Sequence, residues 1–201
     1  MLIGVSKRQP IAAIRELAAA GLDAFGENYA QEFRDKRAAL ADLPALAWHF
    51  IGALQSNKVK LVVGDALIHT VDRARLIDAI ERRAAQRSCT QEVLIEVQLA
   101  PEERKAGVAP DELPALLDHL AGCEHVVCTG LMTIPPVASE LETRRYFASL
   151  RTLRDRLAAS ARRNVDLRHL SMGMSADFEL AILEGATHVR VGTALFGPRP
   201  G

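Results

Sequence analysis

Short apolar runs alternate with longer amphipathic stretches along the whole chain. This alternation limits the possible folds most strongly, because strand–helix–strand units form parallel sheets whose faces are buried by the helices. Eight runs have the composition of buried strands: residues 2–7, 24–27, 49–52, 66–71, 92–99, 126–133, 168–172 and 189–195. Helical spacing of apolar residues is found between them: 11–20, 29–40, 56–63, 73–87, 110–120, 140–163 and 176–184.

The number and order of these elements favour a closed (β/α)8 TIM barrel. Such barrels have about 200 residues or more, so a chain of 201 residues is close to the minimum. An open, doubly wound sheet is the alternative, although no GxGxxG motif follows the first strand. We therefore predict a single barrel domain over residues 1–201, without a domain boundary.

Composition and charge argue against several other classes of protein. The 25 basic residues are balanced by 25 acidic ones, which disfavours a nucleic-acid-binding protein. No apolar run approaches the length of a membrane span, and the first ten residues do not have the pattern of a signal peptide. The three cysteines form no CxxC motif, so we expect reduced thiols in a cytoplasmic protein. Cys123, His125 and Cys128 should be scattered by strand and loop geometry, so we expect no metal site.

Lys7 is the first candidate functional residue. Chemistry in a barrel gathers at the carboxyl ends of the strands, and of the five lysines only Lys7 ends an apolar strand. An amine partly removed from water at this position could attack a carbonyl group and form a Schiff base. The alternative is a lysine at a strand end that points into solvent.

Two motifs near the ends of the last two strands predict an anion site. Gly173-Met174-Ser175 leads into a helix with Ser175 as its expected N-cap, and Gly192-Thr193 comes at the end of the last strand. Free backbone N–H groups and a hydroxyl can bind a phosphate there, as is common in barrels. An ordinary N-cap and a packing glycine are the alternative. With Lys7 opposite, the motifs predict a phosphorylated aldehyde or ketone as ligand.

Arg190 interrupts an apolar strand pattern. A charge in such a position is rarely buried without a partner, so we expect its guanidinium to donate to a ligand atom near the barrel mouth. A salt bridge to a neighbouring carboxylate is the alternative. His69, His119 and His188 show no partner in the sequence, so we expect them to be single and structural.

Motifs spread from residue 5 to residue 197 carry a resemblance to a known family. They are Val5-Ser6-Lys7, FGENY at 25–29, WHFIG at 48–52 with LQSNK at 54–58, Gly130-Leu131-Met132, SMGMS at 171–175 with Asp177, and VRVGT at 189–193 through Phe196-Gly197. In their order and spacing, the chain resembles the YggS/PROSC family of pyridoxal 5′-phosphate (PLP) homeostasis proteins. Lys105 and Gly107 also look like features of this family.

The resemblance implies a fold similar to the N-terminal domain of alanine racemase, with PLP joined to Lys7 as a Schiff base. It implies that Ser175 and the backbone of Gly192 and Thr193 hold the phosphate, and that Arg190 faces the pyridine nitrogen. It also implies that the pocket is lined by Asn28, His49, Met132 and Ser171. Family members carry a long helix before the Val5-Ser6-Lys7 strand, and we expect this domain to lack it, because only residues 1–4 precede that strand.

The resemblance implies a monomeric carrier or regulator of PLP, without a catalytic residue, that serves PLP-dependent apoenzymes. A guanidinium at the ring nitrogen leaves that nitrogen unprotonated, which weakens the electron sink of the cofactor. Alanine racemase also has an arginine there, but a second domain supplies a catalytic tyrosine. We expect no such domain here, because the chain ends at Gly201 after the last strand. The alternative is a PLP- or Schiff-base-dependent, racemase-like enzyme, with His49 as the spare proton-transfer group.

Overall fold

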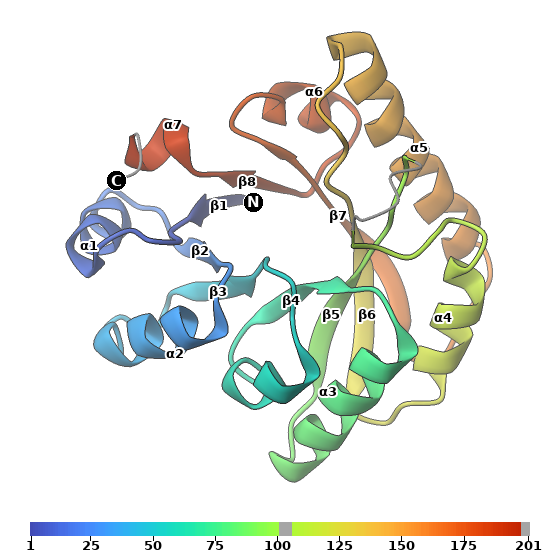
Figure 1. Ribbon diagram of the computed structural model, residues 1–201, viewed down its shortest axis with the longest axis horizontal. Coiled ribbons are helices and arrows are strands. Elements are labelled where there is room, and N and C mark those ends of the chain that lie inside the picture. The colour runs from blue at the N-terminus through green and yellow to red at the C-terminus, as the bar shows by residue number, and fades with distance from the viewer. Residues whose placement is uncertain (101–105, 198–201) are drawn as a thin grey trace.

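Eight parallel strands close into a barrel in sequential order, from β1 to β8 (Figure 1). This computed structural model describes residues 1–100 and 106–197. The strands are β1 (Leu2–Val5), β2 (Ala24–Glu27), β3 (Ala47–Phe50), β4 (Leu67–Val71), β5 (Gln91–Glu96), β6 (Val126–Met132), β7 (Val165–Met174) and β8 (His188–Val191). The barrel is closed by β1 and β8, where Ile3 is in register with Arg190. The predicted barrel is therefore confirmed, and the open-sheet alternative is wrong.

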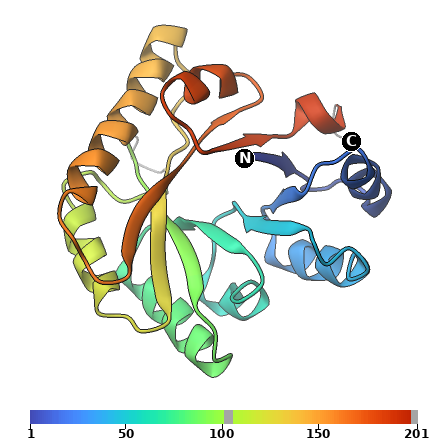
Figure 2. The same ribbon diagram turned by 180° about the vertical axis from the view of Figure 1, so that it is seen from behind.

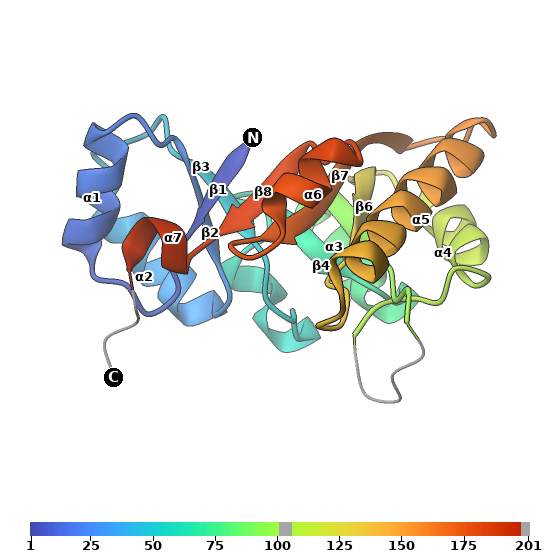
Figure 3. The ribbon, with the colours of Figure 1, turned by 90° about the horizontal axis from the view of Figure 1, so that it is seen from above.

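Helices connect the strands and surround the barrel. They are α1 (Ile11–Ala19), α2 (Ala30–Ala39), the 3-10 helix η1 (Ser56–Leu61), α3 (Ala74–Gln86), α4 (Leu113–Ala121), α5 (Glu140–Ala158), α6 (Phe178–Leu183) and α7 (Thr193–Phe196). Helices α3, α4 and α5 lie outside the strands from β4 to β7 (Figures 1 and 2). The short α7 lies beside α1 (Figures 1 and 3). Along the described ranges, no helix combines the length and the apolar character that a membrane crossing requires.

The main apolar core lies between the sheet and the helices. Side chains alternate along a strand, so every second residue faces the helix layer. Trp48 and Phe50 of β3 do so, and both pack edge to face on Phe33 of α2, with ring centroids 5.8 and 6.5 Å apart. The residue between them, His49, therefore belongs to the face of β3 that lines the barrel interior.

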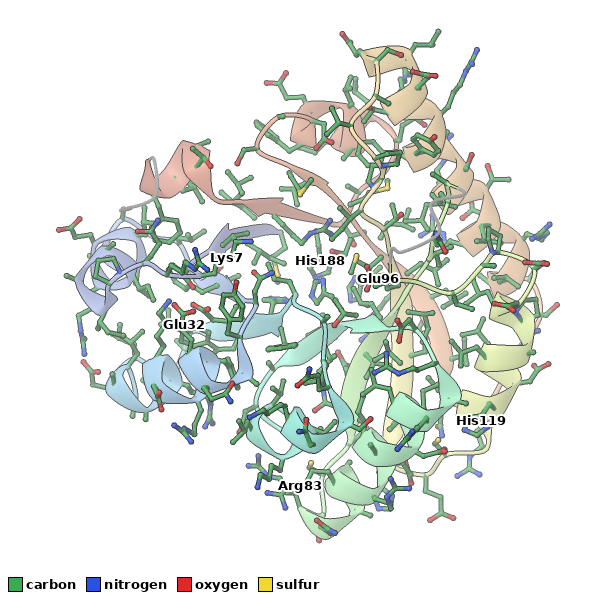
Figure 4. The ribbon with its side chains drawn as sticks, in the orientation of Figure 1. Lys7, Glu32, Arg83, Glu96, His119 and His188 are labelled. Atoms are coloured by element: carbon green, nitrogen blue, oxygen red, sulfur yellow. The ribbon has the colours of Figure 1, made fainter. Side chains whose placement is uncertain are left out.

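The barrel interior contains a group of buried polar side chains, in a fold whose interior is commonly filled by branched aliphatic ones. The imidazole rings of His49, His69 and His188 contact one another edge to face, with centroids 5.1, 5.7 and 5.9 Å apart. Figure 4 shows His188 inside the ring of strands. This arrangement corrects the expectation that His69 and His188 are single side chains.

Several element boundaries differ from those predicted. The strand expected over 189–195 ends at Val191, because the N–H groups of Leu195 and Phe196 donate to the Gly192 carbonyl and coil the chain into α7. The strand expected over 92–99 ends at Glu96, after which Val97 makes only an isolated bridge. The helix expected over 56–63 is a 3-10 helix.

Candidate functional site

Lys7 lies just after β1, at the carboxyl end of the barrel, and is half-buried. In the view of Figure 4, Lys7 and Glu96 lie on opposite sides of the ring of strands, and His188 lies between them. The first residue of the predicted site is therefore where the strand pattern placed it. Its neighbours on both sides are held by groups from β2 and α2.

A buried charge cluster fixes the residue before Lys7. The Lys36 ammonium of α2 donates to the Ser6 carbonyl oxygen at 2.5 Å and pairs with Glu27 Oε1 of β2 at 2.7 Å. The Ser6 hydroxyl donates to the same carboxylate oxygen at 2.7 Å. Burial raises the pKa of Glu27, and its hydrogen bonds from Lys36 and Ser6 act in the opposite direction. The cluster therefore ties β1, β2 and α2 together immediately beside Lys7.

The residue after Lys7 is held by the same helix. Glu32 Oε1 accepts the backbone N–H of Arg8 at 2.6 Å and the Lys36 ammonium at 2.7 Å. Arg8 has a φ of 59°, in the left-handed region that few side chains adopt without a compensating contact. The backbone on both sides of Lys7 is thus fixed from outside the barrel. Sequence reasoning missed Lys36, because Glu32 and Lys36 look like an ordinary i,i+4 pair on a helix surface.

Arg190 lies in the barrel interior and is only 4 % exposed. Its guanidinium donates to Ser171 Oγ at 2.6 Å and to the Thr133 carbonyl oxygen at 3.0 Å. Desolvation lowers its pKa to about 10, and the charge of Glu96 acts in the opposite direction. Arg190 is therefore a cation at neutral pH, and both of its hydrogen-bond partners among the described residues are neutral. Within residues 1–100 and 106–197, Arg190 therefore forms no direct salt bridge, which was the alternative.

Ser171 links Arg190 to two histidines through a series of polar contacts. Ser171 Oγ lies 2.9 Å from His69 Nδ1, and His69 Nε2 lies 3.0 Å from His49 Nδ1. Desolvation lowers the pKa of His49 to about 4 and lowers that of His69 well below its usual value. Both imidazoles are therefore neutral at neutral pH.

Two further histidines that were expected to be unpartnered also have partners. His188 Nδ1 lies 2.8 Å from Thr187 Oγ1, and His119 Nε2 lies 2.8 Å from Asp78 Oδ1. The expectation failed because these contacts join elements that are distant in sequence or depend on ring orientation. His119 of α4 is exposed, and its contact with Asp78 joins α4 to α3 on the surface, outside the group of buried histidines.

The two motifs predicted to bind an anion are brought together. Ser175 Oγ accepts the Gly192 N–H at 3.2 Å, so the connections after β7 and β8 meet. Thr193, the first residue of α7, follows directly and is exposed. Ser175 also lines a cavity of about 560 Å³ between the β6–α5 and β7–α6 connections and the starts of α5 and α6, whose lining does not include Gly192 or Thr193.

Ser175 is not the N-cap that was expected. The N-cap of α6 is Asp177, and its Oδ1 accepts the Met174 N–H at 2.6 Å. This contact closes a turn before the helix begins, which leaves the Ser175 hydroxyl to face β8. Gly173 makes the turn possible, because it has a φ of 92° and a Cβ there would lie 2.5 Å from Ala181 Cβ.

The remaining predicted residues lie near the ends of β2 and β6. Asn28 follows β2, and its Oδ1 is buried with no hydrogen-bond partner among the described residues. Gly52 packs against its backbone so closely that a Cβ would lie 2.0 Å from the Asn28 carbonyl oxygen. Met132, the last residue of β6, is fully buried. Lys105 lies outside the described residues, and Gly107 has a φ of 118°.

Glu96 is a mouth residue that the sequence did not reveal. It is the last residue of β5 and is buried, whereas the prediction of a strand to residue 99 made it look internal. Desolvation and, to a smaller extent, the charge of Asp72 raise the pKa of its carboxyl to about 7, while the charge of Arg190 acts in the opposite direction. The Glu96 carboxyl can therefore gain or lose a proton near neutral pH. No group of three or more metal-ligating side chains occurs in residues 1–100 and 106–197.

Comparison with known proteins assigns the chain to a family. Residues 8–200 match the family model described as alanine racemase, N-terminal domain. The chain belongs to this family. A pyridoxal phosphate homeostasis protein of Aquifex aeolicus is 52% identical over 200 residues, which cover 98% of this chain and 86% of that relative. The protein of the same name from Pseudomonas aeruginosa is 45% identical, with 98% and 84% covered.

A solved structure supports the same assignment within the alanine racemase N-terminal domain family. PipY of Synechococcus elongatus, solved with PLP bound, is 44% identical and superposes with a TM-score of 0.91, covering 98% of this chain and 92% of PipY. The resemblance to the YggS/PROSC family that the motifs predict is therefore confirmed.

Proposed function

We propose that this chain binds PLP as a Schiff base on Lys7 and serves intracellular PLP homeostasis as a carrier. The observation that carries the proposal is the arrangement of three groups at one end of the barrel. Lys7 supplies an amine, the Ser175–Gly192 contact brings together the two motifs predicted to bind an anion, and buried Arg190 supplies a cation. PLP has an aldehyde, a phosphate and a ring nitrogen that match these groups. The relatives named above, and the PLP-bound PipY, support the same ligand.

Unsatisfied polar atoms support the fit of PLP to this site. Asn28 Oδ1 and His49 Nε2 are both buried and have no hydrogen-bond partner among the described residues. A buried polar atom without a partner costs free energy, so a ligand or an ordered water is expected to pair with each. Both residues belong to the set that the resemblance implies.

The roles of the individual residues follow from their surroundings. The Lys36 cluster holds the backbone of Lys7, so its amine is presented from a fixed base. Ser175 and the backbone at Gly192 and Thr193 would hold the phosphate, and the Gly192 N–H, which donates to Ser175 Oγ here, would exchange that bond for one to the phosphate. Arg190 would donate to the ring nitrogen, and a guanidinium has no acceptor atom for a proton from it.

This last role favours a carrier over an enzyme. When bound, PLP supplies an electron sink for carbanion chemistry, and that sink is strongest when a carboxylate keeps the ring nitrogen protonated. Arg190 in that place would leave the nitrogen unprotonated and the sink weaker. We propose that the chain has no catalytic residue.

The partners and location complete the proposal. We propose a monomer that delivers PLP to PLP-dependent apoenzymes in the cytoplasm. The three cysteines are free thiols, as in proteins of a reducing compartment. The formal net charge of zero supports a protein that does not bind nucleic acid.

A racemase-like enzyme is the second candidate, and Glu96 favours it. A buried carboxyl with a pKa of about 7 has the protonation behaviour of a general acid or base. Incubation of the PLP-loaded protein with single enantiomers of amino acids tests this candidate. Racemisation at many turnovers per protein that is lost in Glu96→Gln supports the enzyme, and no turnover supports the carrier.

Absorption spectroscopy tests the proposed binding. PLP joined to a lysine should give a band at about 420 nm. We expect the band in the wild type and in Lys60→Ala, which removes an exposed lysine of η1. We expect it to be lost or strongly reduced in Lys7→Ala. A Lys7→Ala band as strong and as tightly titrated as that of the wild type would contradict the proposal.

A further inference from the structure

The chain of polar groups inside the barrel has a fixed starting direction. Arg190 donates to Ser171 Oγ at 2.6 Å, and a guanidinium has no acceptor atom. Ser171 Oγ must therefore accept this bond. Its own hydroxyl proton remains available, and in the part of the chain that the structure describes the other side-chain partner of Ser171 Oγ is His69 Nδ1, at 2.9 Å.

The direction passes through both imidazoles. If the Ser171 hydroxyl donates to His69 Nδ1, neutral His69 carries its proton on Nε2. That N–H then donates to His49 Nδ1, 3.0 Å away. Neutral His49 must in turn carry its proton on Nε2. The tautomers of both histidines are thus set by the guanidinium of Arg190.

The opposite direction leaves more groups unsatisfied. If His49 Nδ1–H donated to His69 Nε2, then His69 Nδ1–H would donate to Ser171 Oγ, which already accepts from Arg190. The Ser171 hydroxyl proton would then have no acceptor among the described residues. His49 Nε2 has no partner in either direction, so the reversed chain has two unsatisfied groups and the forward chain has one.

We propose that Arg190, Ser171, His69 and His49 form a directional hydrogen-bond relay that presents His49 Nε2–H as a buried donor for an acceptor atom of the ligand. The inference rests on the proposed function for the identity of that ligand, PLP, and deepens it by assigning His49 a donor role. His49 is buried, and its Nε2 is the atom at which the relay ends without a partner. An acceptor atom on the ligand completes the chain, whereas a donor atom there would be rejected.

Nitrogen NMR of the full chain tests the tautomers without any ligand. In long-range ¹H–¹⁵N spectra of ¹⁵N-histidine-labelled protein at neutral pH, we expect His49 and His69 to be protonated at Nε2. His49→Gln and His69→Gln identify the signals, and the surface residue His119 is the internal control. Protonation at Nδ1 of either His49 or His69 would overturn the relay, whether or not the protein binds PLP.

The link through Ser171 has its own test. Ser171→Ala removes the hydroxyl, so His69 should become a mixture of tautomers while the pattern of His119 stays unchanged. Ser171→Thr keeps the hydroxyl and should keep the wild-type pattern. An unchanged His69 pattern in Ser171→Ala would refute the role of Ser171 in setting the tautomer of His69.

Addition of PLP tests the end of the relay. We expect the His49 Nε2–H proton signal to shift downfield and to exchange more slowly with water, while the tautomer is retained. If the tautomers are as expected but the His49 signal does not move when PLP binds, only the donor role of His49 is overturned. Absence of any PLP absorption band would instead contradict the proposed function and leave the tautomer result standing.

Discussion

Replacement of Lys36 by methionine tests how the structure holds Lys7. The Lys36 side chain is 7% exposed and its partner Glu27 is 0% exposed, so the substitution leaves a buried carboxylate without its cation. Loss of one partner of a buried ion pair costs about 3–5 kcal/mol. Methionine has a similar volume, so a cavity contributes little. We expect a loss of stability in this range, together with weaker PLP binding, because the Ser6 carbonyl also loses its donor.

Urea unfolding of three variants measures this effect. Midpoints at unchanged slope report the free energy of unfolding. The double variant Lys36→Met/Glu27→Gln removes both charges and should lose less stability than Lys36→Met alone. Arg34→Met, on the exposed side of the same helix, should change stability by less than about 0.5 kcal/mol. A Lys36→Met protein within about 0.5 kcal/mol of the wild type would refute the stabilising role of the buried charge cluster around Lys36.

Three further substitutions test the barrel mouth and its interior by urea unfolding. The pKa of Glu96 is raised from 4.5 to about 7, so its ionisation destabilises the folded state as pH rises through this range. Glu96→Gln should therefore be more stable than the wild type by up to about 3 kcal/mol at pH 8 and equally stable at pH 4, and a gain in stability that does not depend on pH would contradict the raised pKa. The pKa of His49 is lowered from 6.5 to about 4, so the stability that neutral His49 contributes is present above pH 6.5 and is lost as pH falls. Between pH 7.5 and pH 4 the wild type should lose about 3 kcal/mol more stability than His49→Gln, and parallel plots of stability against pH would contradict this. Gly52→Ala places a Cβ 2.0 Å from the Asn28 carbonyl oxygen and should cost about 1–3 kcal/mol and weaken PLP binding, whereas Gly122→Ala, whose nearest atom is 3.3 Å away, should cost less; equal costs would count against the close approach.

The fold was predictable because the strand and helix patterns are local. Each strand is a short apolar run, and each helix follows with apolar residues at helical spacing, so the order of elements could be read without knowing any contact. The position of Lys7 at the end of β1 followed directly from this order. The end of β8 was missed, because the apolar run continues through Leu195 while the backbone coils at Gly192.

The polar interior could not be predicted in the same way. Alternation along β3 shows that His49 faces away from Trp48, but not that His69 of β4 lies beside His49 or that Ser171 of β7 lies beside His69. Such contacts depend on barrel closure and stagger, which no local pattern encodes.

The charge cluster beside Lys7 was hidden for a related reason. Lys36 and Glu32 are four residues apart on α2 and could have lain on a solvent-facing surface. Only the packing of α2 against β2 brings Glu27 to Lys36 and removes both from water. Ser175 was assigned as an N-cap because serine favours that position, but Asp177, two residues later, also favours it and occupies it.

The central claim is that PLP is joined to the amine of Lys7. Its most direct test is reduction of the PLP-loaded full chain with borohydride, which makes the bond permanent, followed by proteolysis and mass spectrometry of the peptides. The account predicts a pyridoxyl group on the peptide that contains Lys7. A pyridoxyl group found mainly on Lys36, Lys58, Lys60 or Lys105, with Lys7 unmodified, would contradict it.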